Sequence, residues 1–403
     1  MIQFTHGPSA FSDQLVHARA RPTAAAGPPL DGTPHSMSKR RKQHRDEHGT
    51  NLGVYRITRY GSDQLNIPST PADRLKTILA MPNVNTKNLP DFDDLPEVKG
   101  MPKGCAWGIF GEADEVGTLN LLTPDVVMEA RQEIQTGESV QLDWGLENVQ
   151  FPGFGRKEFS QKIIDLSPSG LTAHDDELHI NTQSGSQWDS LRHVAHQATR
   201  TYYNGLHHDD VLGGAKTTRN GIHNWVERGG IVGRGVLIDW AAWADAKGIE
   251  YNPVSRHEIP IAQLDEVAKA QGTEFKHGDI LIVRTGFVRW HDNASTDERK
   301  AGTRDAANFI GVRADEDSKR WLWNHHFAAV AGDTVAFEAW PPRDPILHEW
   351  LLSLWGTPIG EMWNLEELSQ KCKKEGRYTF FLTSAPLNVK GGVGSTPNAI
   401  AVF

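Results

Sequence analysis

Residues 183–193, Gln-Ser-Gly-Ser-Gln-Trp-Asp-Ser-Leu-Arg-His, place Gln187, Asp189 and His193 at spacings of two and four behind a Ser-Gly-Ser turn. The residues before them, 177–183, alternate polar and less polar side chains, so we expect a strand that delivers the first glutamine of this stretch to its end. In an extended segment, residues two apart share a face, and Gln187 and Asp189 can therefore converge on one point. A carboxylate, an amide oxygen and an imidazole on a short loop can hold a divalent cation or relay a proton. The stretch predicts a functional loop rather than a core segment.

The same stretch resembles the motif of the putative cyclase family, which includes bacterial kynurenine formamidase and isatin hydrolase. There it usually reads His-x-Gly-Thr-His-x-Asp-x-Pro-x-His; the first two His and the Asp bind one or two divalent metals, commonly zinc or manganese, and the last His is a general acid/base. Position by position, Gln183 and Gln187 stand where the two His ligands would be, whereas Asp189 and His193 match and Leu191 replaces the Pro. Because amides are neutral and weaker donors than imidazoles, we expect at most one divalent ion, zinc or manganese, in this chain.

Further segments between residues 105 and 403 are similar to the family as well. The resemblance implies that His348 and Glu361 supply the remaining metal ligands, together with Asp189 and, by one interpretation, the amide oxygen of Gln187. Gln187 has a second interpretation, in which its amide orients the substrate in a site without metal. The matching segments are 107–123, 233–239, 277–286, 331–338 and 356–361.

Apolar runs and periodic segments predict an α/β fold with a mixed sheet, and the family resemblance implies a three-layer β/β/α domain. Near-continuous apolar runs such as residues 280–283 suit strands that are covered on both faces. A helix should start at Thr123-Pro124-Asp125 and stop at Gly137. Strands are expected at 139–146, 161–165, 177–183, 235–239, 279–285, 328–333 and 378–383, and further helices at 261–271, 315–327 and 346–354.

Composition predicts the N-terminal organisation, and the family resemblance implies the rest. Residues 1–50 predict a disordered basic tail and 51–104 an N-terminal arm with a helix at 71–81, whereas the resemblance implies a catalytic domain at 105–403. The basic cluster at 38–45 also permits a nuclear-localisation or phosphate-binding reading, which the surrounding Pro, Ala and Gly disfavour. Met37 is a second candidate start.

The formal charge and the cysteine count limit the classes of function. The chain of 403 residues carries a net charge of −9, so residues 51–403 sum to −12 when the +3 of the tail, seven Lys/Arg against four Asp/Glu, is removed. An acidic body argues against nucleic acid as a partner. Two cysteines and the absence of a long apolar run predict a cytoplasmic protein without disulfides or a membrane span. We expect a homodimer or homotetramer.

Aromatic residues beside the motif suggest the walls of a substrate pocket. Trp188 lies between two candidate site residues, Trp363 follows Glu361 by two, and Tyr203 belongs to a Tyr-Tyr-Asn-Gly stretch that is similar to some family members. With Gln183 they form our expected substrate-binding set, which favours a flat, ring-containing substrate.

Three other patterns are weaker. His207-His-Asp-Asp210 looks like a metal cluster, but adjacent residues point apart, so a polar loop is the preferred interpretation. The glycine-rich run 229–235 precedes a strand instead of following one, which is the wrong order for a dinucleotide loop. Serines at 184, 186 and 190 lack the Gly-x-Ser-x-Gly elbow of serine hydrolases.

Taken together, the sequence predicts a hydrolase that cleaves a C–N or C–O bond in an amide, lactone or related ring of a small aromatic molecule. A divalent cation would activate water, with His193, Asp189 and Glu361 as catalytic residues. One alternative is a metal-independent cyclase, dehydratase or isomerase that uses His193 and Glu361 as acid and base. Another is a binding protein that has lost its chemistry; metal content would separate these hypotheses.

Overall fold

The computed structural model describes residues 86–212 and 217–403, which all belong to the compact unit Pro68–Phe403. The expected tail at 1–50 and the expected helix at 71–81 lie outside the described residues. Within the expected arm, residues 92–94 form the short helix η1 (Phe92–Asp94), and Phe92 and Leu95 are buried in the main core.

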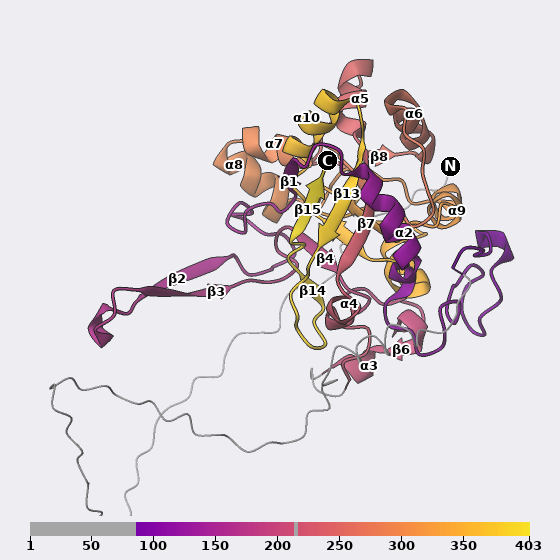
Figure 1. The fold of residues 1–403 in the computed structure, drawn as a ribbon, viewed down its shortest axis with the longest axis horizontal. Helices are drawn as coiled ribbons and strands as arrows, with labels where there is room; N and C mark the ends of the chain where they lie inside the picture. The colour runs from indigo at the N-terminus through magenta and orange to yellow at the C-terminus, as the bar shows by residue number, and fades with distance from the viewer. Residues whose placement is uncertain (1–85, 213–216) are drawn as a thin grey trace, which may run out of the picture. The chain divides into compact units, whose positions relative to one another are not determined.

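One mixed sheet of nine strands organises the unit (Figure 1). Its four central strands run parallel, and the strands on both flanks pair antiparallel. This confirms the α/β class and the mixed sheet. In spatial order the strands are β1 (Ser139–Gln141), β15 (Ala399–Val402), β13 (Thr379–Ser384), β7 (Ile231–Ile238), β9 (Ile280–Val283), β11 (Ala329–Gly332), β12 (Ile359–Glu361), β4 (Gln187–Asp189) and β14 (Gly394–Ser395).

The helices are short, and the longest of them, α6, has the predicted bounds. It contacts β7 and the neighbouring helices α5 and α9. The α-helices are α2 (Pro124–Ala130), α3 (His208–Val211), α4 (His223–Glu227), α5 (Trp240–Lys247), α6 (Ile261–Gln271), α7 (Phe287–Asn293), α8 (Thr296–Lys300), α9 (Glu316–Asn324) and α10 (Glu366–Glu375). Short 3-10 turns are η2 (Gly117–Leu121), η3 (Arg131–Glu133), η4 (Ser167–Ser169) and η5 (Tyr203–Gly205), and π-helical segments are η6 (Ala301–Asp305) and η7 (Glu349–Trp355).

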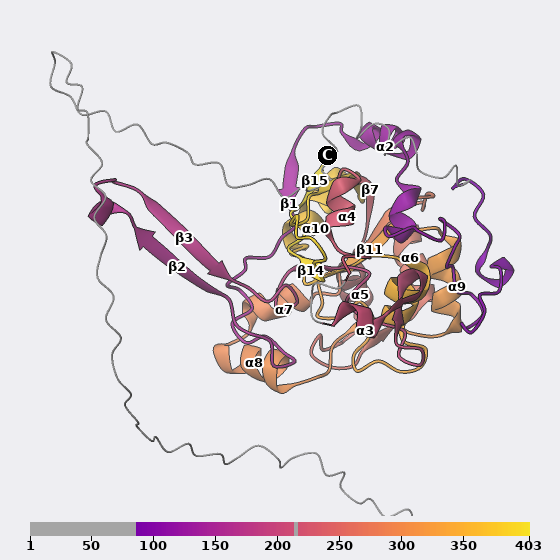
Figure 2. The same ribbon diagram turned by 90° about the horizontal axis from the view of Figure 1, so that it is seen from below.

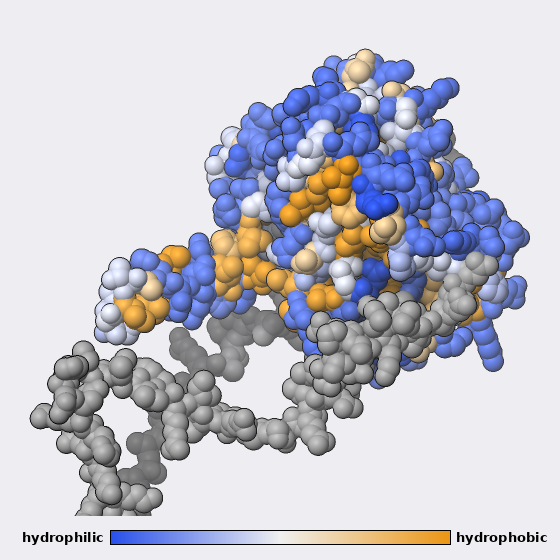
Figure 3. All heavy atoms as spheres, viewed as in Figure 1, coloured by the Kyte–Doolittle hydropathy of each residue, from blue (hydrophilic) through white to orange (hydrophobic). Residues whose placement is uncertain are grey.

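Three pairs of strands lie outside the large sheet: β5 (Thr201–Tyr202) with β6 (Leu206–His207), β8 (Glu258–Ile259) with β10 (Gly311–Val312), and β2 (Ser160–Asp165) with β3 (His174–His179). The β2–β3 hairpin stands out from the rest of the unit in two views (Figures 1 and 2). All residues of β3 are exposed, and exposed apolar side chains, such as Ile163 of β2 and Leu178 of β3, interrupt the hydrophilic surface of the hairpin (Figure 3).

The strand expected at 177–183 is wrong in its bounds, because β3 runs from His174 to His179. β3 ends at His179 because Asn181 starts a turn: its side-chain oxygen accepts from the backbone N–H of Gln183 at 2.9 Å, and its carbonyl accepts from that of Ser184. The following residues were expected to form a loop, yet Gln187–Asp189 is a fully buried strand of the large sheet.

Two other predicted elements end early for local reasons. The strand expected at 139–146 stops at Gln141, since the Asp143 carboxylate takes up the backbone N–H groups of Asn398 and Ala399 in place of a strand. Helix α2 begins as predicted, with the Thr123 hydroxyl accepting from Val126 N, but it ends at Ala130 and not at Gly137.

Candidate functional site

The pairing of β4 with β12 builds the site. Gln187 lies opposite Glu361 in this antiparallel register, and Asp189 lies two residues along on the same face. Gly360, next to Glu361 in β12, has no room for a side chain, because a Cβ atom there would lie 2.7 Å from the Cβ of Ala331 in the neighbouring strand β11. The expectation that Gln187 and Asp189 share a face is confirmed.

The side-chain amide of Gln187 lies at the centre of this face. Its Nε2 is 2.9 Å from Gln183 Oε1, 2.9 Å from Asp189 Oδ1 and 2.9 Å from Glu361 Oε2. The surroundings fix which end of the amide carries nitrogen, because an oxygen in this position would face three other oxygens. Gln187 Oε1, at the other end, is buried and has no hydrogen-bond partner.

His348 approaches the same two carboxylates from the helical turn before η7. Its Nε2 lies 3.0 Å from Glu361 Oε1 and 3.8 Å from Asp189 Oδ2. On the other side of the ring, Nδ1 lies 2.5 Å from Glu338 Oε2, and the backbone N–H of His348 donates to Glu338 Oε1 at 3.1 Å. Glu338 thereby fixes the orientation of the imidazole.

Burial and neighbouring charges have opposing effects on the pKa values of His348, Glu338 and Glu361. Burial disfavours the charged form of His348, but the Glu338 carboxylate, and then Glu361, outweigh it and hold the pKa of His348 well above its usual range. Burial likewise opposes ionisation of Glu338, and the charge and hydrogen bonds of His348 nevertheless lower the pKa of Glu338. Burial and then the charge of Asp189 raise the pKa of Glu361 to about 7.

Asp189 Oδ2 differs from the other carboxylate oxygens of this cluster, because it is buried and accepts no hydrogen bond. Ligand atoms of Asp189, His348 and Glu361 all lie within 4.8 Å of one another. Ligands about 2.1 Å from one ion are separated by about 3 to 3.5 Å, close to the 3.0 and 3.8 Å from His348 Nε2 to the two carboxylates. The three residues therefore fit one divalent cation, and no other group of this kind is found among the described residues.

His193 lies at the edge of the cluster, with Nε2 4.0 Å from Asp189 Oδ2 and a side chain that is 20% exposed. A turn closed by the bond from His193 N to Ser190 O carries it out of the strand. Burial lowers the pKa of His193, against the opposing effect of the Asp189 charge.

Sequence reasoning missed two residues of this site. Glu338 lay in a segment that matched the family, but nothing in its spacing marked it as the partner of His348. Arg156, just before the hairpin, donates to the Gln183 carbonyl at 2.5 Å, and its charge favours ionisation of Glu361. Neither residue is near the motif in sequence.

The structure places the expected pocket walls in two settings, with Trp188 and Trp363 together and Tyr203 apart. Trp188 projects from β4 on the face opposite Gln187, and its indole N–H donates to Ser384 Oγ at 2.9 Å. Trp363 packs edge-on against Trp188 and donates to the Gln187 carbonyl. Tyr203 is buried and donates to Asp114 at 2.9 Å. Their role in substrate binding stays a prediction.

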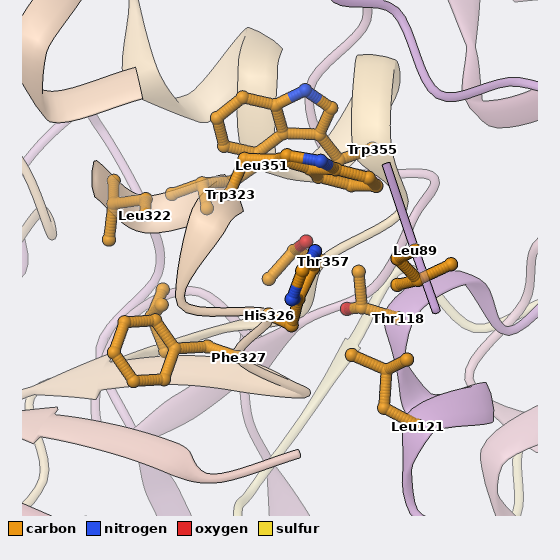
Figure 4. Close-up of a pocket in the computed structure, with 11 residues that line it drawn as sticks. Leu89, Thr118, Leu121, Leu322, Trp323, His326, Phe327, Leu351, Trp355 and Thr357 are labelled. Carbon is orange, nitrogen blue, oxygen red and sulfur yellow. The ribbon is translucent and has the colours of Figure 1, made fainter. Parts of the chain in front are cut away.

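One of two small pockets adjoins the cluster through Gln183, Arg156 and Met362. The rest of it is lined by Trp144, Val149, Gly153, Ser184, Phe287, His291, Thr303 and Val335. The other lies elsewhere, with His326 and Thr357 between Trp323 and Trp355 on one side and Phe327 and Leu121 on the other (Figure 4). None of the carboxylates or histidines of the site lines this second pocket.

The expected polar interpretation of residues 207–210 agrees with their contacts. His208 Nδ1 pairs with the Tyr202 hydroxyl at 2.9 Å, and Asp209 pairs with Arg200. No helix among the described residues is long and apolar enough to cross a membrane.

Comparison with known proteins supplies the family. A crystal structure described as a novel cyclase superposes with a TM-score of 0.66 at 29% identity, covering 74% of this chain and 99% of the other. Isatin hydrolase A from Ralstonia solanacearum gives a TM-score of 0.48 at 17% identity, with 69% and 97% covered, and a predicted metal-dependent hydrolase from Bacillus stearothermophilus gives 0.39 at 17%, with 66% and 97% covered. No protein of curated function matches the sequence. The family model described as Putative cyclase matches residues 109–339, more than half of the chain, and the protein therefore belongs to this family.

Proposed function

We propose that the chain is a hydrolase that cleaves a C–N or C–O bond in an amide, lactone or related cyclic compound, with one divalent cation held by Asp189, His348 and Glu361. The observation that carries the proposal is the buried, unpartnered Asp189 Oδ2 facing His348 Nε2 at 3.8 Å. A carboxylate oxygen left without a donor costs free energy, which a cation between these groups would recover. The donor set of two carboxylates and one imidazole suits zinc or manganese.

Each residue of the cluster has a distinct task in this proposal. A bound cation supplies polarisation of the scissile carbonyl. Glu338 holds the ring of His348 so that Nε2 faces the two carboxylates. His193, whose pKa is lowered by burial, is neutral at pH 7 and can take a proton from the attacking water. The water adds to the carbonyl carbon, the C–N or C–O bond breaks, and His193 returns its proton to the departing nitrogen or oxygen.

The residues that line the small pocket beside the cluster support a ring-containing substrate. Trp144 and Phe287 provide flat apolar surfaces there, and Gln183 and Arg156 provide polar groups at the end that adjoins the carboxylates. Aromatic walls beside polar groups favour a planar ring that carries the reactive carbonyl.

The proposal is tested with a panel of aromatic amides, lactones and cyclic imides, each incubated with the protein and zinc or manganese. The release of a carboxylic acid is measured through the protons that it yields in weakly buffered solution. Hydrolysis of at least one ring compound by the wild type, and a loss of that activity in Asp189→Asn, are expected. A protein that binds these compounds and converts none of them would contradict the assignment.

A second candidate function is an acid–base isomerase or dehydratase that needs no metal. The pKa of about 7 for Glu361 favours it, because a group that titrates near the working pH is well suited to proton transfer. Activity that survives complete chelation of metal would favour this candidate over the hydrolase.

A further inference from the structure

Gln187 divides the two carboxylates of the site between two partners. Asp189 and Glu361 each turn one oxygen toward His348 and the other oxygen toward Gln187 Nε2. The first pair of oxygens belongs to the cation position proposed above. The second pair, with Gln183 Oε1, surrounds the amide nitrogen of Gln187 at 2.9 Å each.

Three acceptors around one amide nitrogen are more than its hydrogens can serve. An amide NH₂ group donates two hydrogen bonds, so one of the three oxygens always lacks a full partner. Gln187 Oε1 is itself buried without a partner, and the whole side chain is 0% exposed. The three buried oxygens around this amide nitrogen have too few hydrogens to bind. A cation in the same place could interact with all three of them, which an amide cannot.

We infer that the Gln187 amide takes the place of a second cation, and that it makes the centre mononuclear. This inference rests on the proposed function, because it assumes that the other pair of oxygens binds a cation. The amide supplies partial positive charge to Asp189 Oδ1 and Glu361 Oε2 and fills the space between them. Residue 187 thus determines how many ions the two shared carboxylates hold.

The inference predicts different effects on metal binding and stability for two kinds of substitution. Gln183→His with Gln187→His replaces the amides with imidazoles, which bind zinc and manganese, and opens the second position to an ion. Gln187→Ala removes the amide and adds no ligand, so two carboxylate oxygens lose their shared donor. Gln161→His is the matched control, because it adds a histidine at an exposed position of β2.

The experiment measures bound zinc or manganese per chain by elemental analysis after loading and gel filtration, with isothermal titration for affinity. We expect one ion per chain for the wild type and for Gln161→His, and two for the double variant. A folded double variant that holds one ion overturns the inference and leaves the proposed function intact. Two ions bound to the wild type would likewise overturn the inference and leave the proposed function intact. A wild type that binds no ion would contradict both the inference and the proposed function.

The Gln187→Ala variant keeps the inference testable if the double variant does not fold. Without metal it should melt at a lower temperature than the wild type, because the carboxylates have lost their donor. Saturating metal should raise its melting temperature by more than it raises that of the wild type, since a cation can now also enter the position that the amide held. An equal shift in the two proteins would overturn the inference.

Discussion

Two clusters of buried carboxylates lie along the same edge of the large sheet, and they differ in how their oxygens are satisfied. Asp239, Arg284 and Asp333 directly follow β7, β9 and β11, and Glu361 ends the neighbouring parallel strand β12. In the first cluster, Arg284 donates one hydrogen bond to Asp239 at 2.8 Å and two hydrogen bonds to Glu366, at 2.8 and 2.7 Å.

The remaining oxygens of this first cluster are satisfied as well. Asp333 accepts from the backbone and hydroxyl of Thr285 and from Gly286 N, at 2.6 to 2.8 Å. The second oxygen of Asp239 accepts from Ser369. In the Asp189–Glu361 cluster, by contrast, Asp189 Oδ2 has no donor, and Gln187 Nε2 serves three acceptors.

Unmatched acceptors, rather than buried charge, distinguish the candidate site from the structural cluster. Each cluster contains three carboxylates and one cationic side chain, Arg284 or His348. The structural cluster has enough donors to fix every oxygen, whereas the candidate site has a surplus of acceptors that a ligand can use.

The largest effect is expected from breaking the structural cluster. Arg284→Met leaves the buried Asp239 and the half-buried Glu366 without their cation, and loss of a buried partner of this kind typically costs about 3–5 kcal/mol of unfolding free energy. Denaturant titration measures the loss. Asp189→Asn, the matched change in the other cluster, should lose less than about 1 kcal/mol because it removes a charge that lacks a full set of donors. Equal losses in the two variants would remove the distinction between the clusters.

The next effect concerns turnover. His193→Ala should lower the rate of hydrolysis by about 100-fold or more, the usual contribution of a positioned proton-transfer group. Asp189→Asn should be at least as damaging, and His207→Ala, which changes an exposed histidine outside the cluster, should have little effect. Because burial lowers the pKa of His193 below its ordinary 6.5, the acid limb of the pH–rate profile should lie below pH 6.5 and disappear in His193→Ala. If His193→Ala keeps both the rate and the acid limb of the pH–rate profile, another residue must be the proton acceptor.

A smaller effect is the dependence of stability on pH. The pKa of Glu361 rises from 4.5 to about 7 on folding, so the folded protein holds a proton that the unfolded chain releases. Glu361 therefore weakens the metal-free fold progressively as pH rises from about 4.5 to 7, and the full cost is present above pH 7. The raised pKa of His348 acts in the same direction, since its stabilising contribution is lost as pH rises through the folded-state value.

Glu361→Gln should remove this penalty. In chelator, the variant should be more stable than the wild type by roughly 1–3 kcal/mol at pH 8 and nearly equal to it at pH 5. Glu367→Gln, at an exposed position of α10, is the control and should follow the wild type. A stability difference that is the same at both pH values would show that the carboxyl of Glu361 does not titrate in this range.

The sequence predicted the mixed α/β fold, because apolar runs such as Ile280–Val283 have few alternatives to a buried central strand. It also singled out Asp189, His348 and Glu361, which the structure brings within 4.8 Å. The bounds of β3 and the strand β4 were predicted wrongly. A turn set by the Asn181 side chain ends β3, and the polar residues Gln187 and Asp189 were interpreted as a loop although they are buried.

Glu338 could not have been identified in the same way. Its link to His348 depends on a tertiary contact between two segments, and a single glutamate after an apolar stretch has no distinctive spacing. The position of the Gln187 amide between two carboxylates likewise depends on the register of β4 with β12, which no local pattern specifies.

Titration of the metal-free protein with zinc or manganese in a calorimeter tests the central claim most directly. We predict that the wild type binds one ion per chain, and that Asp189→Asn and His348→Gln bind it at least about 10-fold more weakly, since each removes one of the three converging ligands. A wild type that binds no ion, or variants that bind it as tightly as the wild type does, would contradict the assignment of Asp189, His348 and Glu361 as a metal centre.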